Sequence, residues 1–145
     1  MTIMVGCQGS GKSTWAKTNR SGATHCSADS YFQVGSSYRF DPSKLGKAHG
    51  ACFRKAIEAI LSGENVVIDN TNSTVTEIAP YYALAQAYGV NVEIVQMTID
   101  PEVSALRNVH GVPGAGVKAT AKRCANLSIP PFWAVTRLVV PNYGV

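Results

Sequence analysis

The nonapeptide GCQGSGKST at residues 6–14 restricts the fold more strongly than any other part of this sequence. It contains the pattern Gly-x-x-x-x-Gly-Lys-Ser, with the short apolar run Ile3–Val5 before it and a helix-competent segment to about Asn19 after it. A phosphate-binding loop requires this context, because it joins the end of a strand to the start of a helix. We therefore expect a strand over residues 3–5, a phosphate loop, and a helix that ends near Asn19.

Each part of the loop has a chemical role in binding a nucleoside triphosphate. Glycines allow backbone N–H groups to close around phosphate oxygens. Lys12 is expected to reach the β- and γ-phosphates, and the Ser13 hydroxyl is expected to bind Mg²⁺. The sequence thus predicts ATP and Mg²⁺ as cofactors. The predicted binding loop comprises Gly6, Gly9, Ser10, Gly11, Lys12, Ser13 and Thr14.

Strand-like and helix-like segments alternate along the rest of the chain. The further expected strands cover residues 23–28, 65–69, 91–99 and 135–140. Helices are expected from Asp41-Pro42 to Gly63, from the capping box Thr74-x-x-Glu77 to Tyr88, from Asp100-Pro101 to about Asn108, and over the basic segment 117–125. Pro80 predicts a late or irregular start of the second of these helices. The alternation predicts an α/β fold with a parallel sheet, helices on both faces, and ligands at the carboxyl ends of the strands.

Length and composition favour one domain over residues 1–145. A chain of 145 residues with 46% hydrophobic residues can bury a core without disulfides or structural metals. The four cysteines are scattered without metal-ligand spacing, and we expect reduced thiols. No apolar run is long enough to span a bilayer and none resembles a signal peptide, so we expect no membrane partner and a cytoplasmic location.

The net charge of +4 is unevenly distributed along the chain. Residues 1–60 carry a net charge of +5, residues 61–102 carry −6, and residues 103–145 carry +5. One interpretation is chance segregation of surface charge that contributes only to solubility. The other is that the two cationic segments line a site for a polyanion. The same alternatives apply to a basic cluster on one expected helix face, made of Lys118, Lys122 and Arg123.

Two aspartates follow expected strands and are candidates for the chemistry. Asp29 follows HCSA and Asp69 follows VVI, and the ends of parallel strands meet at one edge of a sheet. Asp29 could be the general base on an acceptor hydroxyl, and Asp69 could assist Mg²⁺ or hold the acceptor. Either aspartate could instead cap the helix that follows it. An Asn-Lys-x-Asp element is absent, which argues against a GTPase.

Six segments follow one another along the chain: GCQGSGKST, SADSYF, YRFDPSKLGKAH, VVIDNTN, VEIV and RNVHGVP. In this order and spacing, from about Ile3 to Leu127, they resemble the kinase domain of polynucleotide 5'-hydroxyl kinases and related polynucleotide-kinase-like P-loop proteins. The resemblance implies a P-loop kinase fold with a short helical lid over about residues 102–126. It also implies transfer of the γ-phosphate of ATP to the 5'-hydroxyl end of DNA or RNA, as in nucleic acid end processing and repair.

The same resemblance implies roles for individual residues. Lys12 and Ser13 hold ATP and Mg²⁺. Asp29 is the general base on the 5'-hydroxyl, and Asp69 helps to organise the acceptor side. Arg107 matches the lid arginine that clamps the nucleotide phosphates, where it would stabilise charge on the transferred group. An exposed helix arginine without such a role is the alternative for Arg107.

One position departs from the family. Phage-type polynucleotide kinases carry an arginine three residues after the base, where it contacts the scissile phosphate, whereas this chain has Phe32. Either Arg39 or Arg54 takes over that contact, or the chemistry is weaker or different. The rings of Tyr31, Phe32 and Tyr38 follow the base, where they could stack on a terminal nucleobase. Core packing is an equally good interpretation for each ring.

The favoured function is therefore an ATP-dependent polynucleotide 5'-hydroxyl kinase. Two alternatives stay open: a P-loop kinase of a small alcohol or nucleoside, and a non-catalytic nucleotide-binding module that lost turnover through Phe32. His25 and His49 fall within an expected strand and an expected helix, and we interpret both as structural. The role of His110 is left open.

Overall fold

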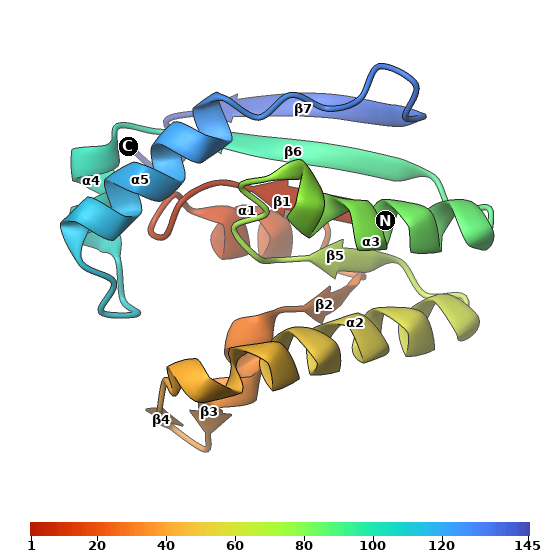
Figure 1. Ribbon diagram of the computed structural model, residues 1–145, viewed down its shortest axis with the longest axis horizontal. Helices are drawn as coiled ribbons and strands as arrows, with labels where there is room; N and C mark the ends of the chain where they lie inside the picture. The colour runs from red at the N-terminus through yellow and green to blue at the C-terminus, as the bar shows by residue number, and fades with distance from the viewer.

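The computed structural model describes residues 1–145. Five parallel strands form one sheet in the spatial order β2-β5-β1-β6-β7 (Figure 1). The strands of this sheet are β1 (Thr2–Val5), β2 (Thr24–Cys26), β5 (Val66–Ile68), β6 (Val92–Thr98) and β7 (Val135–Pro141). A two-stranded antiparallel ribbon made of β3 (Gln33–Val34) and β4 (Ser37–Tyr38) is separate from this sheet and was not expected from the sequence.

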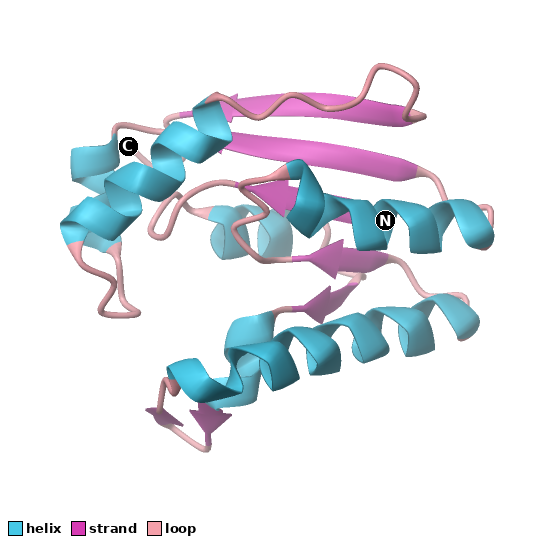
Figure 2. Cartoon of the chain, viewed as in Figure 1, coloured by secondary structure: helices cyan, strands magenta, loops and turns pink.

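Helices lie on both faces of the sheet. Figures 1 and 2 show α1 behind the strands and α3 in front of them. The helices are α1 (Lys12–Asn19), α2 (Leu45–Leu61), α3 (Val75–Ala87), α4 (Pro101–Arg107) and α5 (Gly114–Ala125), with 3₁₀ turns η1 (Ala28–Phe32) and η2 (Pro42–Lys44). None of the helices combines the length and the hydropathy needed to cross a membrane. The predicted α/β fold with a parallel sheet is confirmed.

The central strands are buried on both faces, and their alternate residues belong to two separate hydrophobic clusters. Ile3, Ile68 and Ile94 belong to a cluster of 18 buried residues that also contains side chains of α2 and α3. Met4, the next residue along β1, belongs to a cluster of six buried residues that includes Trp15 of α1. Successive side chains of a strand point to opposite faces, so continuous apolar runs suit a sheet that is covered on both sides.

The capping box predicted for the third long helix is present. The Thr74 hydroxyl accepts a hydrogen bond from the backbone N–H of Glu77, and the Glu77 carboxylate accepts one from the backbone N–H of Thr74. The expected late start at Pro80 is wrong, because α3 begins at Val75 and contains Pro80 in its interior. The capping box satisfies backbone N–H groups at the start of the helix and so stabilises its first turn. Pro80 removes only one backbone N–H donor from the helix.

The strand order places β1 in the middle of the sheet. The chain passes from β1 to β2 and β5 on one side, and then crosses to β6 and β7 on the other. Open α/β sheets bind ligands where the strand order reverses, at the carboxyl ends of the strands. In Figure 1 these ends lie at the left, on the same side as the phosphate loop, α4 and α5. The helical lid predicted for this region stays a prediction.

Asn72 ties the loop after β5 to the central strand. Its side-chain Nδ2 donates a hydrogen bond to the carbonyl oxygen of Met4 at 2.7 Å, and only 1% of the residue is exposed. Its φ of 44° lies in the left-handed region, which asparagine tolerates better than most residues. The loop that carries Asp69 is therefore fixed directly to β1.

We expect Asn72→Ala to lower the free energy of unfolding by about 1–3 kcal/mol, because a buried carbonyl would lose its partner. Alanine would also be strained at φ 44°. Urea unfolding followed by circular dichroism measures the change. Asn91→Ala is the matched control, since Asn91 is exposed and lies just before β6. A loss no larger for Asn72→Ala than for Asn91→Ala would contradict this role of Asn72.

Candidate active site

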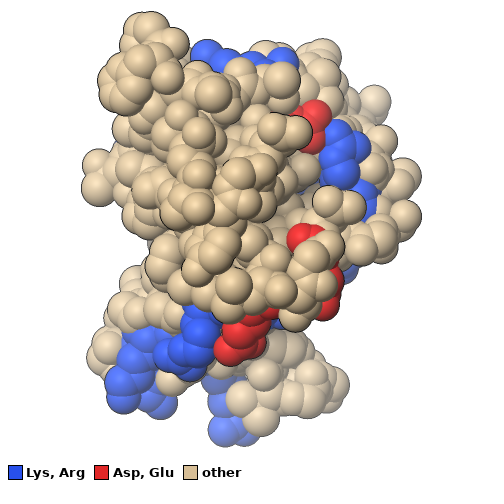
Figure 3. Space-filling model, turned by 90° about the vertical axis from the view of Figure 1, so that its right-hand side faces the viewer, with Lys and Arg blue, Asp and Glu red and all other residues tan.

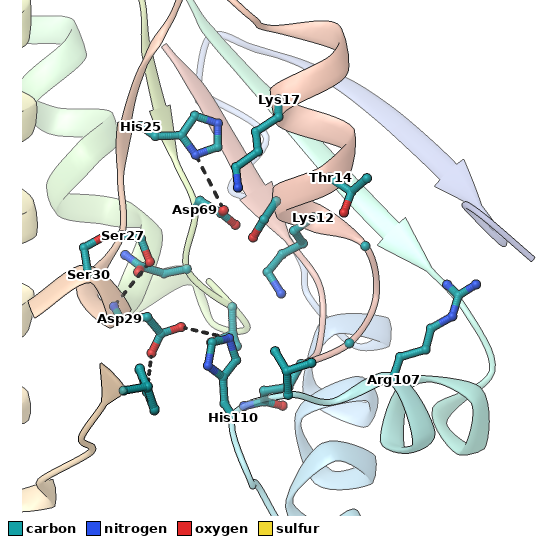
Figure 4. A pocket seen from close by; sticks show the side chains of 18 of the residues that line it. Lys12, Thr14, Lys17, His25, Ser27, Asp29, Ser30, Asp69, Arg107 and His110 are labelled. Carbon is teal, nitrogen blue, oxygen red and sulfur yellow. Dashed lines mark hydrogen bonds and ion pairs between the residues drawn. The ribbon is translucent and has the colours of Figure 1, made fainter. Parts of the chain in front are cut away.

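A cavity of about 1210 Å³ lies at the carboxyl ends of the strands. The phosphate loop forms one wall, and the residues that follow β2 and β5 form another (Figure 4). The structure brings together most of the residues that the sequence singled out: Gly9, Gly11, Lys12, Ser13, Thr14, Asp29, Asp69 and Arg107 line this cavity. Gly6 and Ser10 belong to the same loop but are buried and do not line the cavity.

The phosphate loop has a conformation that favours glycine at two positions. The φ angle is 77° at Gly9 and 90° at Gly11. The backbone N–H of Gly6 donates to the carbonyl of Thr71 at 3.1 Å, which anchors the loop to the segment after β5. α1 begins directly after Gly11 without a side-chain cap. Its first-turn N–H groups are therefore available to bind an anion.

We expect Gly9→Ala to weaken nucleotide binding at least about tenfold, which corresponds to about 1.4 kcal/mol. The added Cβ would overlap the backbone carbonyl oxygen of Ser104 in α4, and it would be strained at this positive φ. Calorimetric titration with a non-hydrolysable ATP analogue measures the affinity. Gly22→Ala is the matched control, because nothing lies within 4 Å of a Cβ at Gly22. Equal affinity in the two variants would refute the close packing of the loop on α4.

Lys12 is almost completely buried beside the loop. Only 9% of the residue is exposed, and Nζ donates a hydrogen bond to the carbonyl oxygen of Cys7 at 2.9 Å. Burial lowers the pKa of the Lys12 ammonium, and the nearby Asp69 carboxylate opposes that shift. Figure 4 shows the side chain extending from α1 into the cavity. Lys12 is thus a desolvated donor in the place where the sequence predicts bound phosphates.

Asp29 and Asp69 reach the cavity from two neighbouring strands. β2 is shorter than predicted, and Asp29 lies in the 3₁₀ turn η1 that follows it. The Asp29 side chain is 52% exposed. The Asp69 side chain is 5% exposed, and its Oδ2 lies 3.7 Å from Nδ1 of His25. Neither aspartate caps a helix, because Ser27 caps η1 and Thr74 caps α3, so the capping alternative is wrong.

The oxygen donors on the cavity wall suit a magnesium nucleotide. Mg²⁺ is usually held by one or two protein oxygens together with phosphate oxygens and water. The Ser13 hydroxyl, in the first turn of α1, and the Asp69 carboxylate offer such oxygens in the same cavity. The chemistry of these oxygen donors therefore fits the predicted metal, and the roles of Ser13 and Asp69 toward it stay predictions.

Arg107 ends α4 and is bound to the C-terminal turn. Its Nη1 donates to the carbonyl oxygen of Tyr143 at 3.0 Å, and its Nη2 donates to that of Gly144. Tyr143 also packs on the phosphate loop, since a Cβ at Gly11 would lie 3.1 Å from its ring. In Figure 4 the Arg107 side chain extends away from Asp29 and His110. Arg107 is therefore placed at the end of the cavity that is remote from Asp29.

The residues proposed to replace the family arginine do not line the cavity. Arg39 and Arg54 are both outside its wall, as is Tyr31, which is 41% exposed. Phe32 is only 3% exposed and packs edge-on against Phe40, with ring centroids 5.1 Å apart. Its ring is thus part of the core and is not available for stacking on a nucleobase. We therefore leave these four residues out of the acceptor site.

Some lining residues were not singled out from the sequence as site residues. Lys17 is four residues after Ser13 and shares its helix face, a spacing that could have identified it. His25 was interpreted as structural, yet it lines the cavity beside Asp69. Tyr38, which the sequence suggested only as a ring that could stack on a nucleobase, contacts Asp29 from nine residues along the chain. His110 contacts Asp29 from the distant link after α4, and the sequence carries no local signal of that contact.

Cationic side chains from both ends of the chain meet in the cavity. Lys12 and Lys17 come from the first cationic segment and Arg107 from the last. Figure 3 shows the end of the molecule opposite the phosphate loop, where Lys and Arg side chains lie at separate places with acidic side chains between them. The cations of the cavity are thus Lys12, Lys17 and Arg107, and the opposite end of the molecule carries further cations of its own.

The basic cluster of α5 is largely engaged within the protein. Lys118 forms an ion pair with Glu102, and Arg123 donates to the Ser73 hydroxyl at 3.1 Å. Lys122 is exposed. Of the three cations, only Lys118 is thus paired with an acid, whereas Arg123 donates to neutral hydroxyl groups.

Comparisons with known proteins agree with this architecture. Residues 1–111 match the family model described as an AAA domain. The chain is 36% identical over 121 residues to NEDD4-binding protein 2 of Homo sapiens, a match that covers 77% of this chain and 7% of the relative. It is 27% identical over 109 residues to the bifunctional polynucleotide phosphatase/kinase of Schizosaccharomyces pombe, covering 75% of this chain and 24% of the relative. The chain therefore matches only a small part of each relative's length.

Solved structures of low sequence identity share the fold. A chain of the Pnkp1/Rnl/Hen1 RNA repair complex superposes with a TM-score of 0.71 at 20% identity, covering 86% of this chain and 43% of that chain. A protein of Chloroflexus aurantiacus gives a TM-score of 0.69 at 16% identity, covering 97% and 86%. A gluconokinase from Sinorhizobium meliloti gives 0.57 at 17% identity, covering 96% and 81%. The molecule thus has a P-loop kinase-like fold.

Proposed function

This chain belongs to the AAA domain family, and from that premise we propose that it is an ATP- and Mg²⁺-dependent kinase of the 5'-hydroxyl ends of DNA or RNA. One observation carries the proposal: the phosphate loop with its buried Lys12 lines the same cavity as the exposed Asp29. Phosphoryl transfer needs a cradle for the donor and a group that accepts the proton of the attacking hydroxyl. In this proposal the phosphate loop supplies the first and Asp29 the second.

The donor half consists of the loop, Lys12 and Ser13. Backbone N–H groups of the loop and of the first turn of α1 bind the phosphate oxygens. Lys12 donates to the γ-phosphate and neutralises charge that develops there, an effect strengthened by its dry surroundings. Ser13 and Asp69 would hold Mg²⁺, which would neutralise phosphate charge when bound. Arg107 adds positive charge when it exchanges its carbonyl partners for phosphate oxygens.

The acceptor half is centred on Asp29. The acceptor oxygen forms a bond to the γ-phosphorus while the bond to the leaving ADP oxygen breaks, and the hydroxyl proton passes to the Asp29 carboxylate. Because Asp29 is half exposed, an acceptor that enters the cavity from solvent can reach it.

A nucleic acid acceptor is supported by two findings. Among the charged side chains that line the cavity, Lys12, Lys17 and Arg107 outnumber Asp29 and Asp69, and Lys17 is left for an anionic acceptor once Lys12 and Arg107 bind ATP. The Schizosaccharomyces pombe relative is a bifunctional polynucleotide phosphatase/kinase.

A small alcohol is the second candidate acceptor. It is favoured by the size of the cavity, about 1210 Å³, which can enclose ATP together with a small second molecule. A gluconokinase also shares the fold. The third interpretation, a binding module without turnover, keeps its reason: Phe32 is a core residue, and neither Arg39 nor Arg54 lines the cavity to replace the family arginine. Absence of label on every acceptor would favour it.

An acceptor panel distinguishes these functions. The protein is incubated with γ-labelled ATP and Mg²⁺ in the presence of 5'-hydroxyl DNA, 5'-hydroxyl RNA, nucleosides or sugars. We expect label on an oligonucleotide, with a rate that falls steeply as salt is added, because bound phosphates release counterions. Label on a sugar or nucleoside alone would refute the polynucleotide acceptor.

A further inference from the structure

The Asp29 carboxylate has a separate partner at each of its oxygens. Tyr38 of β4 donates its hydroxyl hydrogen to Oδ1 at 3.1 Å. Nε2 of His110, in the link between α4 and α5, lies 3.7 Å from Oδ2. The Tyr38 and His110 rings pack on each other with centroids 5.1 Å apart. Figure 4 shows the His110 ring beside Asp29, with a dashed line that joins the two side chains.

Tyr38 is a permanent donor in this group. Burial, together with the charge of Asp29 and its hydrogen bond, raises the pKa of Tyr38 to about 12. The phenol therefore keeps its proton at neutral pH and holds Oδ1. The His110 ring lies against Oδ2 at 3.7 Å without a hydrogen bond, so the lone pairs of Oδ2 can accept the proton of an acceptor hydroxyl.

The link that carries His110 also touches the donor half of the site. The backbone N–H of His110 donates to Oδ1 of Asn108 at 3.0 Å, and the Asn108 amide donates to the carbonyl of Val112 at 2.6 Å. These bonds form a compact turn. The turn packs on the phosphate loop, since a Cβ at Gly9 would lie 3.1 Å from the backbone nitrogen of Asn108. One short segment thus contacts both the loop and Asp29.

We propose that His110 is a positioning residue, which orients the Asp29 carboxylate toward the acceptor hydroxyl through its contact with Oδ2. The inference rests on the proposed function, because it assigns to Asp29 the task of accepting the proton. With Tyr38 on one oxygen and His110 on the other, rotation of the carboxylate is restricted. The link that carries His110 also packs on the phosphate loop. The segment that orients Asp29 therefore contacts the part of the site that binds ATP.

The first test separates orientation from binding. We expect His110→Ala to lower kcat for oligonucleotide phosphorylation by about 10- to 100-fold, as a misaligned catalytic group does. KM for ATP should remain within about twofold, because the donor contacts are untouched. His110→Gln should recover most of the loss, since its amide N–H can occupy the place of Nε2–H. His49→Ala, an exposed histidine of α2 outside the cavity, is the matched control and should retain wild-type kcat.

Two kinetic results would overturn the inference. An unchanged kcat in His110→Ala would show that Asp29 needs no such partner. A His110→Gln variant as slow as His110→Ala would assign His110 to proton transfer instead of orientation.

A second readout does not depend on turnover. In ¹⁵N spectra of histidine-labelled protein, the ring resonances of His110 should shift when Asp29→Asn is introduced, whereas those of His49 should not. Unmoved His110 resonances would overturn the inference even if the wild type phosphorylates oligonucleotides. Shifted resonances in a protein that phosphorylates no acceptor would support the pairing and refute only the proposed function. Failure of the inference about His110 and failure of the proposed function therefore give different results.

Discussion

Lys12→Met is expected to reduce kcat/KM for phosphoryl transfer by about 100- to 1,000-fold, the loss typical of removing one preorganised charge-stabilising donor. Methionine has a similar length and fills the same space without the ammonium group. The loss arises because the γ-phosphate would develop charge next to an apolar side chain in a dry site. Transfer of label from γ-labelled ATP, at several ATP concentrations, gives the two kinetic parameters.

The same variant should fold at least as well as the wild type. Burial lowers the pKa of the Lys12 ammonium, so folding disfavours its charged form, and methionine removes that cost. A thermal melt monitored by circular dichroism tests this expectation. Lys55→Met, at an exposed position of α2 outside the cavity, is the matched control and should leave the kinetics unchanged. Retention of more than half of the activity in Lys12→Met would refute the assignment of the phosphate loop.

Asp29→Asn is expected to lower kcat by about 100- to 10,000-fold, the range for loss of a general base. The amide keeps the shape of the carboxylate and can still accept the hydrogen bond from Tyr38, so the fold should be preserved. It cannot take a proton from the acceptor hydroxyl. KM for ATP should change little, because Asp29 faces the acceptor.

Single-turnover measurements separate this effect from product release. Glu58→Gln provides the control, since Glu58 is an exposed acid on α2 that does not line the cavity. If Asp29→Asn and Glu58→Gln react at the same rate, the proton is accepted elsewhere and the acceptor half has been assigned wrongly.

The sheet and its helices were predictable because their signals are local. The run before Gly6 and the run NVVID are apolar enough to be buried on both faces, and both form central strands. The box at Thr74 predicted the start of α3 against the contrary signal of Pro80. The β3–β4 ribbon is a local hairpin in which Gly35 and Ser36 join Val34 to Ser37, and this Gly-Ser turn signal was missed. The C-terminal turn depends on a contact between distant segments, from the backbone N–H of Asn142 to the carbonyl of Thr98, and no local pattern predicts it.

The candidate site was predictable to a similar degree. Lys12, Asp29 and Asp69 could be placed together because the carboxyl ends of parallel strands meet at one edge of the sheet. A phenylalanine ring can stack on a nucleobase or pack in a hydrophobic core. The burial of Phe32 in the structure shows that its ring packs in the core. His110 could not be assigned, because its partner is brought near by the fold of the link rather than by helical or strand spacing.

The central claim, that this chain phosphorylates the 5'-hydroxyl end of a polynucleotide, is tested most directly by locating the transferred phosphate. A 5'-hydroxyl oligonucleotide, as DNA or RNA, is incubated with γ-labelled ATP and wild-type protein, and the product is digested to mononucleotides. Lys12→Met supplies the background, and an oligonucleotide that already carries a 5'-phosphate supplies the blocked acceptor. We predict label only in the 5'-terminal mononucleotide of the free-hydroxyl substrate. Label no higher than in Lys12→Met, with either nucleic acid, would contradict the claim.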